Sequence, residues 1–314
     1  MARKDDEKDF DRRHFLKCMA WVGTGAVWTL SGGALKGSPL GQATRAPMAH
    51  GADALRFVQI SDSHIGFDKP ANTDVTATLR AAIARIKADP EPPAFVLHTG
   101  DLTHLSKPAE FDLAQQLLAR IRVTELHTVP GEHDTADAGV TGYFSRFGKA
   151  SDNKGYYSFD HAGVHFIALI NVLDFKDGGL GVLGPRQLAW AKADLEARSS
   201  STPIVVFAHM PLWTIYEPWG WGTSDAGELM AQLRRFGSVT VLNGHIHQIV
   251  QKVEGNMTFH TARSTAFPQP AAGVGAGPGP LKVGAGELGR ALGITSVSVA
   301  AHPAATSFVE SPLG

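Results

Sequence analysis

The sequence predicts an α/β fold, and three observations support this prediction. From about Ala54 onward, short apolar runs rich in β-branched residues alternate with helical patterns, as in chains of β-α-β units. Several apolar runs end in side chains that bind metals or act as acids and bases, and ligand sites in α/β sheets lie at the carboxyl ends of strands. The chain has 314 residues, 43% hydrophobic and 19% charged, which is enough for a full core.

The strands and helices can be placed along the chain from their apolar periodicity. Strands are expected at 55–60, 94–99, 126–130, 165–170, 203–208, 239–243 and 257–261. Helices are expected at about 73–88, 108–121, 185–198 and 225–236. The predicted helix N-caps are Asn72, Ser106 and Ser224, and Pro185 suits a first helical position.

The last part of the chain has weaker signals. Residues 268–280 are rich in Pro, Gly and Ala and are predicted to form a loop. Residues 281–314 show only weak strand signals, such as 295–300, and are too few for a separate domain. The predicted organisation is a targeting segment with its linker over 1–50 and a single domain over 51–314, with 281–314 as a C-terminal extension.

The N-terminus resembles a bacterial twin-arginine export signal. Arg12 and Arg13 precede Phe-Leu-Lys and a moderately apolar stretch, from Cys18 to about Leu35, that is too short and too weakly apolar for a stable membrane span. An amphipathic helix or a chance arginine pair is the alternative interpretation. The resemblance implies passage of the folded protein through the twin-arginine machinery to the periplasm or the exterior, with cleavage between about 34 and 50.

The net charge and the cysteine content bear on two questions, whether the protein binds nucleic acid and whether it contains disulfide bonds. The formal net charge is -1 and no long basic run is present, which argues against a nucleic-acid duplex as a partner. The single cysteine, Cys18, lies in the predicted targeting segment, so the mature domain is expected to have no disulfide. The sequence does not define an oligomeric state.

The residues after the apolar runs carry the chemistry. Asp62 and His64 follow the first run, and a spacing of two in an extended segment places both side chains on one side. Asp101 follows the second run after Gly100, where a carboxylate can bridge two cations. Later runs lead to His209 and to a histidine pair with the same spacing of two, His245 and His247. This mixture of nitrogen and oxygen donors suits Mn, Fe or Zn.

Five ordered motifs resemble the blocks of the calcineurin-like metallophosphoesterases. They are Asp62-Ser63-His64, Gly100-Asp101, Gly131-Glu132-His133-Asp134, His209 and Gly244-His245-Ile246-His247. The pattern spans about residues 55–265. The sequence around 61–66 and 100–103 is most similar to the branch of class III cyclic-nucleotide phosphodiesterases and glycerophosphodiesterases. The resemblance implies a four-layer α/β/β/α sandwich of two mixed β-sheets flanked by helices.

The resemblance also implies a role for each motif residue. Asp62, His64 and His247 would hold one metal ion, and His209, His245 and Glu132 would hold a second. Asp101 would bridge the two ions, which would be divalent or mixed-valence transition metals. Such a pair lowers the pKa of a bridging water and stabilises in-line attack on a phosphodiester or phosphomonoester. His133 would protonate the leaving oxygen, oriented by Asp134.

Residue 132 departs from the family pattern, which usually reads Gly-Asn-His. Glu132 either ligates the second metal and adds a negative charge, or marks a mononuclear or degenerate site. The leading hypothesis is therefore a metal-dependent phosphoesterase. The alternatives are a non-catalytic metal-binding protein on the same scaffold and a metal-dependent hydrolase that acts on another kind of bond.

Two further residues are candidate substrate contacts. His104 stands where the related branch often carries Asp, and the alternative is a solvent-exposed side chain. Trp213 begins an aromatic, loop-like stretch after His209 that could line a pocket and stack on an organic substituent, and the alternative is ordinary packing or an oligomer contact.

Overall fold

The computed structural model describes residues 26–31, 34–39 and 54–314, apart from 124, 137–139, 153, 302 and 303. The chain divides into two units, Met1–Ala49 and His50–Gly314. In the first unit, β1 (Ala26–Ser31) and β2 (Ala34–Pro39) pair antiparallel. The predicted twin-arginine pair at positions 12 and 13 lies outside the described residues.

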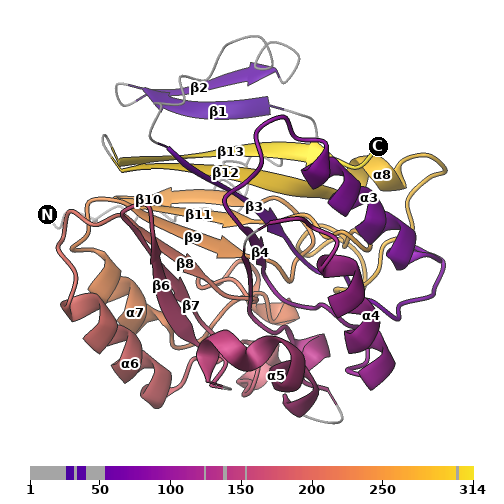
Figure 1. The fold of residues 1–314 in the computed structure, drawn as a ribbon, viewed down its shortest axis with the longest axis horizontal. Helices are drawn as coiled ribbons and strands as arrows, with labels where there is room; N and C mark the ends of the chain where they lie inside the picture. Colours follow the sequence, from indigo (N-terminus) through magenta and orange to yellow (C-terminus); the bar gives the residue numbers. More distant parts are fainter. Residues whose placement is uncertain are drawn as a thin grey trace, which may run out of the picture. The chain divides into compact units, whose positions relative to one another are not determined.

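The second unit contains two mixed β-sheets (Figure 1). One has the strand order β13-β12-β3-β4-β5, in which β3, β4 and β5 are parallel and β12 runs antiparallel to both of its neighbours. Its strands are β3 (Leu55–Ile60), β4 (Val96–His98), β5 (Leu126–Thr128), β12 (Gly293–Ala301) and β13 (Ala304–Pro312).

The other sheet has the order β10-β11-β9-β8-β7-β6, with four parallel strands between two antiparallel edge strands. Its strands are β6 (Tyr157–His161), β7 (Val164–Ala168), β8 (Ile204–Phe207), β9 (Val239–Asn243), β10 (Gln251–Glu254) and β11 (Met257–Thr261). Antiparallel edges on a parallel centre are common in α/β folds.

Helices cover the outer face of each sheet, as Figure 1 shows for the two sides. The five-stranded sheet is covered by α3 (Val75–Lys87), α4 (Pro108–Leu118) and α5 (Thr141–Phe147). The six-stranded sheet is covered by α6 (Pro185–Glu196) and α7 (Ala226–Leu233). The short helices are η1 (Glu132–Asp134), η2 (Gly148–Ser151), η3 (Asp177–Gly179), η4 (Glu217–Trp219) and α8 (Leu288–Ala291).

The two-residue periodicity of the strands explains the layering. In β3, Phe57 faces the core between the sheets, whereas Val58 and Ile60 face the helices. Phe57 stacks on Phe95 at 5.0 Å between ring centroids and meets Phe166 of the other sheet edge-on at 5.5 Å. Aromatic pairs of this kind contribute about 0.5–1.5 kcal/mol beyond their buried area. The expected four-layer α/β/β/α sandwich is therefore confirmed.

The structure corrects several boundaries of the predicted elements. The helix N-caps are Asp74, Lys107 and Asp225 rather than the predicted residues one or two positions earlier, while Pro185 does occupy the first position of α6. The prediction missed α5, β6, β10 and β13. Residues 293–312 do more than extend the domain, because β12 pairs directly with β3 in the five-stranded sheet. Across the described parts of the chain, no helix combines the length and apolar character needed to cross a membrane.

Candidate metal centre

The predicted metal ligands all follow the carboxyl ends of parallel strands. Asp62 and His64 come after β3, Asp101 after β4, and Glu132 after β5, so three loops of one sheet contribute. The loops after β8 and β9 of the other sheet supply the remaining ligands, His209, His245 and His247. Two sheets packed face to face thus bring seven side chains from distant parts of the sequence to one place.

The backbone at these ligands differs from the expected extended form. Asp62 and His64 have φ of 53° and 41°, and His245 and His247 have φ of 70° and 54°, all in the left-handed region. The prediction of an extended segment was therefore wrong. Asp62 and His64 do lie together, but through left-handed backbone. Left-handed backbone in non-glycine residues costs on the order of 1 kcal/mol each and concentrates at functional sites.

Asp62, His64 and His247 form the first of two ligand groups, and all three are buried. The Nε2 atoms of His64 and His247 lie 3.2 Å apart, and His247 Nε2 lies 3.3 Å from Asp62 Oδ1. Asp101 lies beside this group, with its Oδ2 atom 3.5 Å from His64 Nε2. One ion can therefore reach donor atoms from three loops.

Glu132, His209 and His245 form the second group. Glu132 Oε2 lies 2.8 Å from His209 Nε2, and Glu132 Oε1 lies 2.9 Å from His245 Nδ1. Asp101 Oδ2 also lies 3.4 Å from His209 Nε2, so the Asp101 carboxylate stands between the two groups. This is the place that a bridging ligand would occupy.

The donor atoms of the second group fit a metal ion. Glu132 Oε2, His209 Nε2 and both ring nitrogens of His245 are buried, yet none makes a hydrogen bond of acceptable geometry within the described structure. Buried polar atoms normally have partners, because leaving one unpaired costs about 1–3 kcal/mol. A cation placed between Glu132 Oε2, His209 Nε2 and one ring nitrogen of His245 would satisfy these three atoms, and such nitrogen and oxygen donors suit a transition metal.

Two of the histidines are oriented by backbone carbonyl groups. His209 Nδ1 donates to Thr99 O at 2.7 Å, and His247 Nδ1 donates to Phe267 O at 2.6 Å. Each bond places the proton on Nδ1 and leaves Nε2 free to bind a metal. Burial lowers the pKa of His209, but Asp101 and Glu132 outweigh it and hold that pKa well above its ordinary value. The carboxylates thus favour positive charge at this point.

Glycines allow the loops to approach one another closely. A Cβ atom on Gly131 would collide with the Asp101 side chain, and one on Gly100, whose φ is +98°, would collide with the ring of His209. The glycines of the sequence motifs therefore keep space for the ligands themselves.

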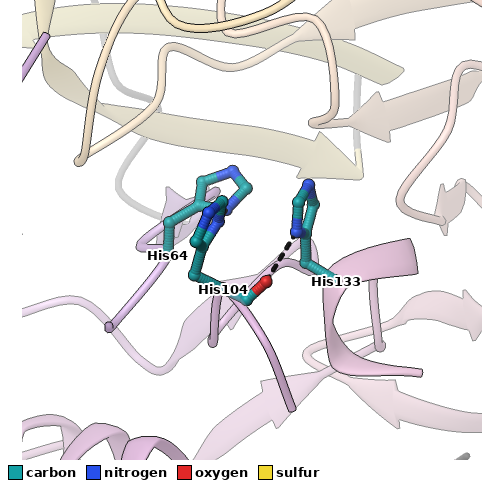
Figure 2. Close-up of side chains that lie close together, drawn as sticks. All are labelled: His64, His104 and His133. Carbon is teal, nitrogen blue, oxygen red and sulfur yellow. Dashed lines mark hydrogen bonds between the residues drawn. The ribbon is translucent and has the colours of Figure 1, made fainter. Parts of the chain in front are cut away.

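His64, His104 and His133 gather at the edge of the first group (Figure 2). His133 Nδ1 donates to His104 O at 2.7 Å, the bond drawn in the figure, which leaves His133 Nε2 free. The rings of His104 and His133 stack with 4.8 Å between centroids, and His104 Nδ1 lies 3.4 Å from His64 Nδ1. Figure 2 shows His104 beside His64 and His133, and the His104 side chain is half-buried.

The charge environments of these histidines differ. Burial lowers the pKa of His133, but the carboxylates of Asp101 and Glu132 outweigh burial and raise it above the ordinary value. Burial, together with the nearby positive charges of His133, Lys69 and Lys107, lowers the pKa of His104 to about 4. His104 is thus neutral near pH 7, and Lys69 and Lys107 lie on its side of the site.

Asp134 has a different place from the one expected. In the described structure no hydrogen bond joins it to the His133 ring, which is oriented instead by the His104 carbonyl. Its buried carboxylate accepts hydrogen bonds from the backbone N–H groups of Leu102, Thr103 and Gly131 at 2.8–3.0 Å. Asp134 therefore links the loop after β4 to the loop after β5 through hydrogen bonds, and these bonds fix the two loops that carry Asp101 and Glu132.

Trp213 lies away from the described ligand contacts. Its ring packs at 4.9 Å on Phe259, against the apolar core beneath α6 and α7. This packing agrees with the alternative of an ordinary core residue, and a substrate contact by Trp213 stays a prediction.

Several supporting residues had no signal in the sequence. Asn243 donates to the carbonyl groups of Ala208 and Met210, on either side of His209. Gln269, from the loop predicted at 268–280, donates to His245 O at 3.0 Å. Isolated amides of this kind have no spacing pattern, so only the fold shows what they hold.

Comparisons with known proteins agree with this geometry. Residues 55–249 match the family described as calcineurin-like phosphoesterase. A probable cyclic nucleotide phosphodiesterase of Rhodopseudomonas palustris is 25% identical over 225 residues, which are 68% of this chain and 78% of the relative. Purple acid phosphatase 23 of Arabidopsis thaliana is 31% identical over 134 residues, 38% of this chain but only 27% of the plant protein.

Solved structures share the fold. A dimetal phosphatase from Danio rerio superimposes with a TM-score of 0.61 at 14% identity, covering 83% of this chain and 98% of the fish protein. A purple acid phosphatase from yellow lupin gives a TM-score of 0.56 at 14% identity, covering 78% of this chain and 49% of the lupin chain. With the family match extending over more than half of its residues, this chain belongs to the calcineurin-like phosphoesterase family.

Proposed function

We propose that this protein is a metal-dependent phosphoesterase that hydrolyses a phosphodiester or a phosphomonoester. The observation that supports this most strongly is the convergence of seven buried or half-buried ligand side chains around donor atoms that lack hydrogen-bond partners. The first group and the second group would each hold one Mn, Fe or Zn ion, with Asp101 between them. Bound there, the ions would supply an activated water and neutralise charge on the phosphoryl oxygens.

The protein itself would contribute a proton donor. His133 is held through Nδ1 by the His104 carbonyl, so its Nε2 atom can face a bound substrate. The carboxylates of Asp101 and Glu132 raise the pKa of His133, which favours the protonated ring that can give a proton to the leaving oxygen. His104, stacked on the same ring, would contact the substrate beside it.

The proposal is tested by metal analysis together with assays on bis-aryl, mono-aryl and cyclic-nucleotide phosphates. Cyclic nucleotides belong in this set because one relative is named a probable cyclic nucleotide phosphodiesterase. We expect Asp101→Asn to lose metal and activity together, since a neutral amide cannot replace a carboxylate between two cations. A purified parent protein without metal and without activity would refute the proposal.

The second candidate is a non-catalytic metal-binding protein. It is favoured by one observation, the carboxylate of Glu132 at the position where the family usually has an amide. Full metal occupancy with no turnover on any phosphoester would support it.

A further inference from the structure

Glu132 is the most exposed of the three carboxylates in the site. Its side chain is 28% exposed, whereas those of Asp62 and Asp101 are 0% and 2% exposed. His245, which shares the second group, is also partly exposed at 12%. Glu132 and His245 are therefore the more exposed ligands of the site, although Glu132 Oε2 itself is buried.

The Glu132 carboxylate lies close to two histidine side chains. Its oxygens lie 2.8 Å from His209 Nε2 and 2.9 Å from His245 Nδ1, so both oxygens are directed at the second group. Both oxygens therefore place their negative charge beside the donor atoms of the second group.

Among the residues that the structure describes, no lysine or arginine forms an ion pair with the three carboxylates of the site. The ion pairs of Asp62, Asp101 and Glu132 all have histidine partners. Lys69 and Lys107 act on His104 instead. Sites that bind phosphate dianions commonly use such cationic side chains. Lys69, Lys107 and His133 supply positive charge on the His104 side of the site, whereas Glu132 has no lysine or arginine partner in the described structure.

The charge balance then distinguishes two kinds of substrate. Three carboxylates would leave a pair of divalent cations with one net positive charge, where the usual asparagine would leave two. A phosphomonoester carries close to two negative charges above its second pKa of about 6, whereas a phosphodiester carries one. The Coulomb attraction between the site and an anion scales with the product of their charges. The smaller positive charge of this site therefore weakens the binding of a dianion more than that of a monoanion.

We propose that Glu132 makes this site selective for phosphodiester monoanions over phosphomonoester dianions. The inference rests on the proposed function and narrows its substrate class. Glu132 acts as a specificity-determining residue through its negative charge, in addition to its part in holding the second metal.

The test compares two substrates with the same leaving group, bis(4-nitrophenyl) phosphate and 4-nitrophenyl phosphate, at about pH 8 and low ionic strength. In Glu132→Gln and Glu132→Asn, the diester-to-monoester ratio of kcat/KM should fall on the order of 10- to 100-fold. Glu132→Asp keeps the charge and should keep the ratio. Glu196→Gln removes an equal charge from an exposed site at the end of α6 and is the matched control. An unchanged ratio in both amide variants would overturn the proposal.

A second measurement needs no turnover and no variant. Calorimetry on the metal-loaded parent compares inorganic phosphate, mostly a dianion at this pH, with dimethyl phosphate, a monoanion. The proposal requires similar affinities, within about tenfold, and a much tighter dianion would overturn it. Metal-loaded protein that hydrolyses neither substrate would overturn the proposed function, while calorimetry would still decide the charge selectivity.

Discussion

At the scale of single residues, the site depends on backbone conformations that the sequence does not display. Five ligands, including Asp101 with φ of 54°, adopt left-handed backbone, although none is a glycine. The identity of the ligands could be predicted, because each follows an apolar run and matches a motif. Their backbone conformation could not, since it results from the packing of loops from two sheets.

His133 is expected to serve turnover without serving metal binding. Its ring is held by His104 O and it belongs to neither of the two ligand groups defined above, although ligand atoms of Asp101, Glu132 and His133 lie within 4.8 Å of one another. We therefore expect His133→Ala to keep its metal content and to lose on the order of 10²–10⁴-fold in kcat, as for removal of a general acid. The loss should shrink for substrates with acidic leaving groups. An equal loss on every substrate would argue against proton donation.

His98 is a buried histidine that joins two ligand loops. Its Nδ1 atom accepts from Gly100 N–H at 3.3 Å, and its Nε2 atom lies 2.9 Å from Ser63 Oγ, which itself donates to Leu102 O. This arrangement requires a neutral ring with its proton on Nε2. Burial lowers the pKa of His98 to about 3, far below the ordinary value of 6.5.

The lowered pKa of His98 makes folding stability depend on pH. Because the unfolded chain takes up the proton first, the contribution is fully present above pH 6.5 and is lost as the pH falls toward about 3. The slope is about 1.4 kcal/mol per pH unit. Urea unfolding of metal-free protein should show the stability difference between parent and His98→Gln shrinking between pH 6.5 and 4. A difference that stays constant would contradict this account.

At the scale of elements, the accuracy of prediction follows burial. Strands β8 and β9 are buried along their whole length and were placed to within a residue or two. Strand β10, exposed at all four residues, and β13 were not predicted. Their strand form comes from pairing with β11 and β12 rather than from their own composition, so local sequence carries little of the signal.

Strand β12 is expected to be essential although its sequence is weakly apolar. Val297 is fully buried between the sheets, opposite Phe57 of β3. We expect Val297→Asp to destabilise the protein by several kcal/mol, because it buries an unpaired carboxylate. Val309→Asp on β13, where the side chain is 44% exposed, should cost about 1 kcal/mol or less. Chemical denaturation of both variants measures the contrast, and equal stability would place β12 outside the folded core.

At the scale of the whole molecule, the fold class could be predicted but the strand order could not. The alternation of strands and helices, together with the family resemblance, was sufficient for a four-layer sandwich. The insertion of β12 beside β3 joins residues more than two hundred positions apart in the chain, and no local pattern encodes such a pairing. Export, likewise, would act on the folded chain as a whole.

Export through the twin-arginine route remains a prediction from Arg12 and Arg13. A receptor reads the arginine pair as an address, and lysine keeps the charge but lacks the planar guanidinium group. We therefore expect the double change to lysine to leave a folded, metal-loaded precursor in the cytoplasm of a bacterial host. Cell fractionation with metal analysis measures this. The matched control changes exposed Arg80 and Arg85 of α3 to lysine and should be exported normally. Unimpaired export of the Arg12 and Arg13 variant would show that the pair is not a signal.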